Sequence, residues 1–442
     1  MTDIALGVAS FPALLLLIFL RVPIGLAMFL VGMAGYYYLT GGMKLTFSVL
    51  KSHTYSEFSS YSLSIVPMFL LMGHFATLGG MSTALFKAAE AFLGHRRGGV
   101  AMSAVGACAG FGAICGSSLA TAATMGQVAL PELRRYGYSG GFSTATLAAG
   151  GTLGILIPPS VILVIYATLT EQNIAKLFLA AFIPGILAAI GYMLTISIYV
   201  RLHPDAAGVR PPVPMRERFK ALAAVWPVLM VFLAVIGGIN LGVFSPTEGA
   251  AVGAAGTGLI ALLSGGLSWS KLAESFLATG RNTAMIFFIV FGAAFYNAFL
   301  ARSGAPQALS DFIAGSGLSP WLILTIILVL YLIFGCIMDS LSMILLTIPI
   351  FWPIISTLDF GLNSTEEVAI WFGIIVLIVV EVGLITPPVG MNLFVINSMD
   401  PKTPIVETYR AVMYFVASDM VRVVVLILFP GITLFFLRLF GG

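Results

Sequence analysis

The sequence predicts an all-α polytopic membrane protein with about ten transmembrane helices and two re-entrant helical hairpins in inverted-topology repeats. Three observations support this fold class. Of the 442 residues, 59% are hydrophobic and 9% are charged, whereas about a quarter of the residues of a soluble domain are charged. Apolar runs long enough to cross a bilayer recur from Ile4 to the C-terminus. Two phrases of the first half also recur, in the same order, in the second half.

The apolar runs divide into membrane spans and two arms. The first run follows Asp3 rather than a basic segment and continues into further apolar sequence. We therefore interpret it as a retained span and not as a signal peptide. Segments 43–60 and 267–280 carry scattered Lys, Glu and aromatic residues, and we expect them to lie at the membrane interface. The expected spans are 4–20, 22–40, 62–80, 140–170, 176–201, 219–238, 244–264, 281–300, 368–397 and 408–440.

The recurring phrases indicate an internal duplication. "FGAICGSS" at 111–118 corresponds to "FGCIMDSL" at 334–341, and "GILIPPS" at 154–160 corresponds to "GLITPPV" at 383–389. Either match alone is weak, but two matches in the same order favour a repeat.

The longest polar segment, 201–220, separates the two copies and carries five basic residues against two acidic ones. The positive-inside rule assigns it to the cytoplasm. We expect one repeat in 1–210 and a second in 211–442. An odd number of spans in each half inverts the second copy and leaves both termini in the periplasm.

Each copy contains a segment that is better interpreted as a re-entrant hairpin than as two crossings. In the first, 97–133, no polar loop separates the two arms, and a non-helical tip at membrane depth is tolerated only inside protein or beside a wet cavity. Basic pairs at 96–97 and 134–135 predict that this hairpin opens to the cytoplasm. The second, 320–358, lacks comparable basic clusters, which predicts an opening to the periplasm.

Paired prolines interrupt one span of each copy, 140–170 and 368–397. Proline has no N–H and clashes with the carbonyl four residues earlier. Pro158 and Pro159 are therefore expected to free the carbonyls of Gly154 and Ile155. In the second copy, Pro387 and Pro388 should free those of Gly383 and Leu384.

A desolvated hard cation is a natural partner for such oxygens, and broken helices at the midplane coordinate Na⁺ in transporters. The alternative is a simple kink satisfied by neighbouring hydroxyls or water. The repetition of the pattern beside a serine-bearing tip favours the ion. The oxygens expected at the tips are those of Ser117, Ser118, Asp339, Ser340 and Ser342.

An organic anion is expected between the two tips, because the helices that restart after the breaks direct their positive ends inward. No intramembrane arginine is placed as a clamp, which leaves recognition to hydroxyls, amides and helix ends. The nearby donors are Thr121, Thr124, Ser160, Thr386 and Asn392.

Other polar residues have competing interpretations. Asp339 could cap a helix or bind an ion. Glu381 could tune the ion site or pair with another helix. Glu248 is expected to cap a helix, and His74 to be a packed side chain. "GYSGG" at 137–141 matches the hydrolase elbow, but it does not follow a strand, so we interpret Ser139 as a helix N-cap.

Several function classes are disfavoured. The sequence has no Walker A, HExxH or CxxC pattern, so neither ATP nor a metal centre is expected to power it, and we expect no enzyme activity. The net charge of +3 does not suggest nucleic acid. Cys108, Cys115 and Cys336 lie in apolar segments without ligand spacing.

Four ordered motifs resemble the large membrane subunit of tripartite ATP-independent periplasmic (TRAP) transporters. They are "GAICGSSLATAATMG" at 112–126, "GGTLGILIPPS" at 150–160, "MDSLSMILLTIPIFWPI" at 338–354 and "EVGLITPPVGMNLFV" at 381–395. The resemblance covers nearly the whole chain.

That family implies a multi-pass subunit of a bacterial inner membrane transporter that is coupled to sodium, with two or more ions and no organic cofactor. It implies a small four-helix membrane subunit and a periplasmic binding protein as partners, and a carboxylate substrate such as a C4-dicarboxylate or sialic acid. It also implies an elevator mechanism, in which both hairpins and both broken helices form the transport domain.

Two sets of site residues are expected, of which the resemblance implies the sodium-binding one. The sodium-binding set is Gly116, Ser117, Ser118, Gly151, Gly154, Ile155, Asp339, Ser340, Ser342, Gly383, Leu384 and Thr386. The substrate-binding set is Thr121, Thr124, Pro158, Ser160, Pro387, Gly390 and Asn392. The alternatives are a stand-alone divalent-anion and sodium symporter and, less favoured, an intramembrane serine hydrolase at Ser139.

Overall fold

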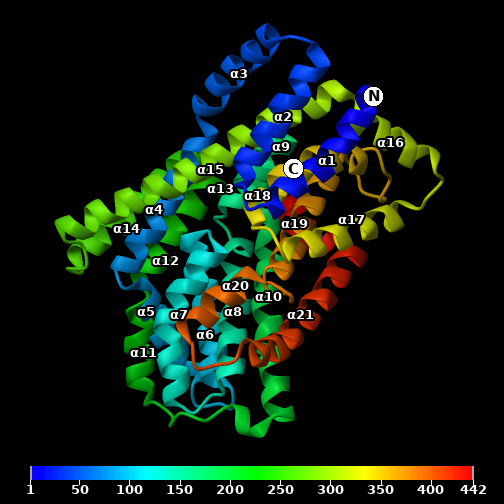
Figure 1. Cartoon of the computed structure of the whole chain (residues 1–442). Helices are drawn as coiled ribbons and strands as arrows, with labels where there is room; N and C mark the ends of the chain where they lie inside the picture. Colours follow the sequence, from blue (N-terminus) through cyan, green and yellow to red (C-terminus); the bar gives the residue numbers. More distant parts are fainter. Residues whose placement is uncertain (1, 441–442) are drawn as a thin grey trace.

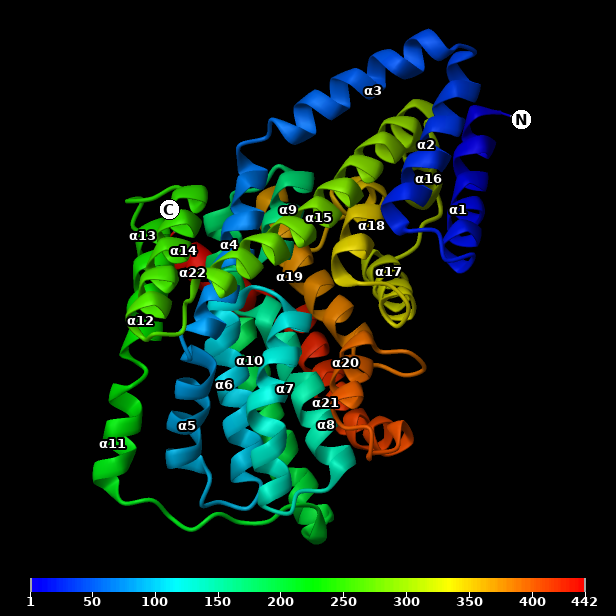
Figure 2. The same cartoon turned by 60° about the vertical axis from the view of Figure 1, so that its left-hand side comes forward.

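A computed structural model describes residues 2–440, and every regular element in that range is helical. The helices form two groups (Figures 1 and 2). By length and hydropathy, four of the described helices could each cross a membrane, and two bent pairs raise that number to six. Shorter apolar helices account for the expected spans at 4–20 and 22–40.

The first group is built around α15 (Trp269–Ser303), a 35-residue helix that packs against α2 (Ile24–Thr40) and α4 (Ile65–Leu78). Small residues permit the close approach, since a Cβ placed on Gly292 would lie 2.1 Å from the carbonyl oxygen of Gly25. The remaining members are α1 (Asp3–Phe19), α3 (Met43–Phe58), α14 (Pro246–Leu263) and α16 (Ala305–Gly315).

The second group contains both copies of the repeated motifs. Its first-half members are α5 (Met81–Leu93), α6 (Gly99–Cys115), α7 (Ser118–Arg135), α8 (Gly140–Leu156), α9 (Val161–Thr170) and α10 (Ile174–Leu202). Its second-half members are α17 (Pro320–Gly335), α18 (Ser340–Ile355), α19 (Thr365–Gly383), α20 (Met391–Met399), α21 (Ile405–Leu428) and α22 (Pro430–Phe440). Between the halves lie α11 (Met215–Ala223), α12 (Trp226–Phe232), a π-turn at Leu233–Gly237 and α13 (Gly238–Asn240).

The two helix pairs α6–α7 and α17–α18 open toward opposite ends of α10. At one end of α10, the loop that follows it contacts the open end of the α6–α7 pair, where the N–H of Arg210 donates to the carbonyl of Gly94. At the other end, Lys176 pairs with Glu366, at the start of the helix that follows α18. The 29 residues of α10 separate these ends by about 43 Å at ~1.5 Å per residue. Figure 2 accordingly places α6 and α7 in the lower half and α17 and α18 in the upper half.

Two expected boundaries are wrong. The arm expected at 267–280 and the span expected at 281–300 form one continuous helix, α15. This stretch contains no proline, and each of its two helical glycines, Gly280 and Gly292, costs only about 1 kcal/mol. Conversely, the span expected at 408–440 is two helices, because Pro430 cannot continue α21 and instead begins α22.

Candidate functional site

The turn between α6 and α7 is made by two residues. Gly116 adopts φ +65°, a left-handed conformation that ends α6 without the steric cost that a side chain would bring. Ser117 then caps α7, and its hydroxyl accepts the N–H of Ala120 at 3.4 Å. The sequence-predicted tip is therefore confirmed as a tight turn between two helices.

The turn between α17 and α18 uses a carboxylate instead. Asp339 caps α18 and accepts the N–H of Ser342 at 2.9 Å. Its other oxygen accepts the hydroxyl of the same serine. The capping role expected for Asp339 is confirmed, and both carboxylate oxygens have partners within the turn.

The paired prolines break both expected helices. The first break separates α8 from α9 with a bend of 45°, and residues 151–160 are buried throughout. The second break covers 384–390, between α19 and α20, and there Pro388 is exposed.

Each helix pair packs against the break in its own half of the chain through a pair of glycines. A Cβ added to Gly112 would lie 2.7 Å from the Cα of Gly154, and one added to Gly383 would lie 2.5 Å from the Cα of Gly335. Gly112 matches Gly335, and Gly154 matches Gly383, in the aligned motifs. Both copies therefore bring backbone against backbone at the same point, where no side chain fits.

At the first break, the expected free oxygens are present. Within the described residues, neither the carbonyl of Gly154 nor that of Ile155 accepts a hydrogen bond. Ser117 and Thr121 lie against Gly154, because a Cβ there would meet the Ser117 carbonyl oxygen at 2.6 Å and the Thr121 hydroxyl oxygen at 2.3 Å. That hydroxyl is buried without a hydrogen-bond partner. These oxygens together match the ligand preference of a hard cation.

At the second break, the expectation of free carbonyls is wrong. The oxygen of Gly383 accepts the N–H of Thr386 at 3.0 Å, and that of Leu384 accepts the N–H of Asn392 at 3.1 Å. The longer break folds into tight turns that return N–H groups to these oxygens. Each carbonyl retains a second lone pair.

Glu381 joins the two helix pairs. It is 1% exposed, and one carboxylate oxygen accepts the hydroxyl of Ser340 at 2.7 Å. Ser118, at the other tip, lies within reach of the same carboxyl group. The sequence left the role of Glu381 open, and the structure brings it to the junction of the tips.

The expected substrate-binding residues do not form a single cluster. Ser160 is buried and caps α9 through the N–H of Leu163, and Asn392 is buried with its amide 3.4 Å from the carbonyl of Ala148. Gly390 is buried, with φ +66°. Pro158 is buried and Pro387 is partly exposed, in different breaks.

Thr124 instead lines a cavity of about 490 Å³ between α7, α4 and α15, next to Ser117. His74 projects from α4 into the same wall, near Glu274. Most polar residues of α15 at the cavity were missed because 267–280 was expected to be an interfacial arm, while Asn282 lies in the span expected at 281–300. Those that line the cavity are Lys271, Glu274, Ser275 and Asn282.

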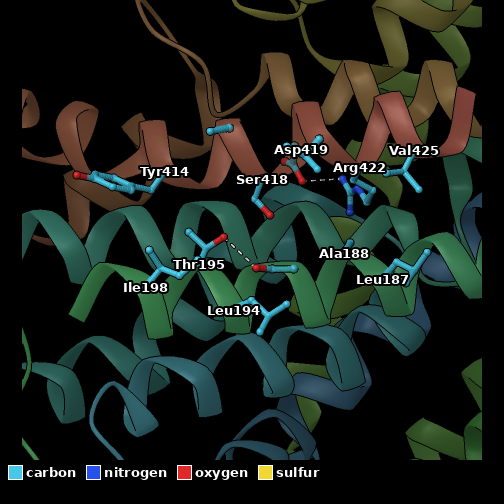
Figure 3. Close-up of a pocket in the computed structure, with 13 residues that line it drawn as sticks. Leu187, Ala188, Leu194, Thr195, Ile198, Tyr414, Ser418, Asp419, Arg422 and Val425 are labelled. Atoms are coloured by element: carbon cyan, nitrogen blue, oxygen red, sulfur yellow. Dashed lines mark hydrogen bonds and ion pairs between the residues drawn. The ribbon is translucent and has the colours of Figure 1, made fainter. Parts of the chain in front are cut away.

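A buried polar chain links the first break to the outer helices. The Thr152 hydroxyl lies 2.9 Å from that of Tyr192, which donates to Asp419 at 2.7 Å. Asp419 pairs with Arg422 at 2.8 Å, and both residues are buried beside a groove between α10 and α21 (Figure 3). The charge of Arg422 is therefore balanced by Asp419. The i,i+3 spacing of Asp419 and Arg422 in an apolar helix was the signal that sequence reasoning overlooked.

The remaining expectations are minor. Ser245 and Glu248 form a capping box, as expected for Glu248. Ser139 occupies the N-cap position of α8, but its side chain makes no capping hydrogen bond. Within the described residues, no three His, Cys, Asp or Glu side chains gather into a metal-binding cluster, and Cys108, Cys115 and Cys336 are free thiols.

Comparisons with known proteins agree with this arrangement. Residues 11–432 match the family model of the DctM component of tripartite ATP-independent periplasmic transporters. The large permease protein of a C4-dicarboxylate TRAP transporter from Pseudomonas aeruginosa is 37% identical over 376 residues, covering 85% of this chain and 86% of the relative. That of a sialic acid TRAP transporter from Vibrio cholerae is 30% identical over 96% of this chain and 97% of the relative.

A solved structure shares the fold alone. The YdaH transporter of Alcanivorax borkumensis superposes with a TM-score of 0.64 at 15% sequence identity, over 88% of this chain and 89% of that one.

Proposed function

Because the chain belongs to the DctM family of TRAP transporter large permeases, we propose that it is the sodium-coupled carrier subunit that imports a carboxylate by an elevator mechanism. It is a multi-pass membrane protein of a transport system and not an enzyme. Relatives that are named for C4-dicarboxylates and for sialic acid support a carboxylate substrate.

One observation carries the proposal of sodium coupling. Both helix pairs meet a broken helix through paired glycines, and at the first break the buried oxygens of Gly154, Ile155 and Thr121 have no hydrogen donor. An unpaired carbonyl in a membrane interior costs several kcal/mol. A desolvated Na⁺ would offset that cost.

The ion sites follow from this packing. The first would use Gly116, Ser117, Ser118, Gly151, Gly154 and Ile155. The second would use Asp339, Ser340, Ser342, Gly383, Leu384 and Thr386. Opening of the two helix pairs toward opposite ends of α10 supports two inverted repeats, 1–210 and 211–442, each with one re-entrant hairpin.

The substrate would occupy the cavity beside the first tip, where Thr124 and Ser117 face α4 and α15. Lys271 on the cavity wall could bind a carboxylate, although Glu274 on the same wall offsets its charge. The second helix group would act as the transport domain and move against the first. The helix ends at Pro158, Ser160, Pro387, Gly390 and Asn392, with Thr121, would contribute to recognition as the two tips close.

A small membrane subunit and a periplasmic binding protein are the proposed partners. Two relatives are longer than this chain, which covers 65% of the isethionate permease DctMQ of Oleidesulfovibrio alaskensis and 66% of the sialic acid permease SiaT of Haemophilus influenzae. The name DctMQ denotes two components in one protein, which supports a small membrane subunit as a partner of this chain.

Uptake into proteoliposomes that contain this chain and the small subunit, with binding protein outside, is expected to require sodium. Replacement of sodium by choline should abolish uptake, and undiminished uptake in choline would exclude the coupling.

Omission of the binding protein from the same proteoliposome assay should also stop transport. Equal uptake without it would favour a stand-alone symporter.

The double variant Ser117→Ala with Ser340→Ala is expected to raise the sodium concentration needed for half-maximal uptake by about tenfold. The reason is that each change removes a hydroxyl at one tip. A sodium titration of initial uptake rates tests this. Glu217→Gln, on exposed α11, is the control and should leave the titration unchanged.

A further inference from the structure

We propose that Glu381 binds a sodium ion between the two hairpin tips, at a third site distinct from those at the two helix breaks. The inference rests on the proposed sodium coupling. It concerns a residue that neither proposed ion site includes.

Glu381 has a buried carboxylate oxygen without a partner. Glu381 is 1% exposed, and Ser340 donates to its Oε1 at 2.7 Å. Its Oε2 is buried without a hydrogen-bond partner, and no ion pair in residues 2–440 involves it. An isolated carboxylate in such a place is strongly unfavourable, so a positive charge is required for it to stay ionised.

Arg422 does not neutralise Glu381. Arg422 pairs with Asp419 at 2.8 Å and so neutralises that carboxylate. Asp419 acts on Glu381 as a second negative charge. The single charge of Arg422 is therefore already balanced by Asp419, and the charge of an ionised Glu381 has no partner.

The oxygen atoms around Glu381 suit a hard cation. Glu381 offers an unpartnered carboxylate oxygen, and hydroxyls of Ser340 and Ser118 lie beside it. Carboxylate and hydroxyl oxygens prefer hard cations. Sodium is the hard monovalent cation that the proposed transport supplies.

The site at Glu381 has no counterpart in the first half of the chain, unlike the two ion sites proposed at the helix breaks. In the aligned motifs, Glu381 corresponds to Thr152 of the first repeat. Thr152 is neutral, donates to the carbonyl of Ala149 at 2.7 Å and contacts Tyr192 at 2.9 Å. The first half of the chain therefore needs no ion at this position. The negative charge of Glu381 has no equivalent there. An ion held here would lie between Ser118 of one hairpin and Ser340 of the other.

The test counts sodium ions on the purified complex by equilibrium binding of radioactive sodium. Wild type is expected to bind one ion more than Glu381→Gln, and Glu217→Gln should match wild type. An equal number for wild type and Glu381→Gln would overturn the proposal, because Glu381 would then carry a permanent proton. No sodium binding to wild type would instead refute the proposed function itself.

A charge-preserving variant keeps the test valid if Glu381→Gln does not fold. Glu381→Asp retains the negative charge but withdraws the carboxylate by one methylene. The sodium affinity of one site is expected to fall by about tenfold, as for a lost charge-assisted contact, while the number of ions at saturation stays constant. Unchanged affinities at every site would overturn the proposal.

Discussion

Gly383→Ala is expected to abolish substrate uptake. The added Cβ would lie 2.5 Å from the Cα of Gly335, and backbone atoms cannot rotate out of the way. The tip of the second hairpin would be displaced from the break, and a misplacement of about 1 Å at a site can cost ~100-fold in rate. Initial uptake rates in proteoliposomes, normalised to the amount of inserted protein, provide the measurement.

Gly280→Ala is the matched control for that change. It substitutes another glycine by alanine in a helix, but nothing lies within 4 Å of its added Cβ. Uptake should remain within about twofold of wild type, and stability should rise slightly because alanine favours helix. Normal uptake by Gly383→Ala would mean that the tip does not need to stay against the break.

Arg422→Ala is expected to destabilise the protein severely. Asp419 would remain buried with no cation, and breaking a buried ion pair from one side costs about 3–5 kcal/mol. Asp419 also accepts the hydroxyl of Tyr192, which contacts Thr152 in the first broken helix. Thermal unfolding of the detergent-purified protein, followed by size-exclusion fluorescence, should show a large loss of stability.

The double variant Asp419→Asn with Arg422→Met distinguishes the charge from the packing. It removes both charges together and is expected to recover much of the lost stability, because a neutral replacement of a buried pair is often tolerated. Arg281→Ala, which removes an exposed arginine of α15, should have no effect. A stable Arg422→Ala protein would show that the pair contributes little.

The local features of the site could be predicted from the sequence because each has a short-range cause. Gly116 and Ser117 specify a helix end followed by a cap, and Asp339 specifies another cap. The proline pairs specify breaks, since they remove N–H donors wherever they occur. These features reappear at the predicted positions, and the aligned glycines of the two copies make equivalent contacts.

Features that depend on distant segments could not be predicted. Whether the carbonyls of Gly383 and Leu384 accept hydrogen bonds depends on how residues 384–390 fold back. The positions of the prolines alone do not determine this. The cavity beside Ser117 needs side chains of α4 and α15, and the sequence does not state which faces of these helices meet α7.

The loop after α10 determines where the chain would have to bend during transport. Arg210 pairs with Glu90 at 2.8 Å, and Phe92 of α5 contacts Phe219 of α11, so α11 would travel with the hairpin-bearing group. Further along the chain, Val235 packs against Gly253 of α14, which belongs to the first group. In this connection, a displacement of one group against the other would be taken up between residues 219 and 235. The π-turn at Leu233–Gly237 holds an extra residue per turn at the end of this stretch, and its conversion to α-helix would lengthen the connection.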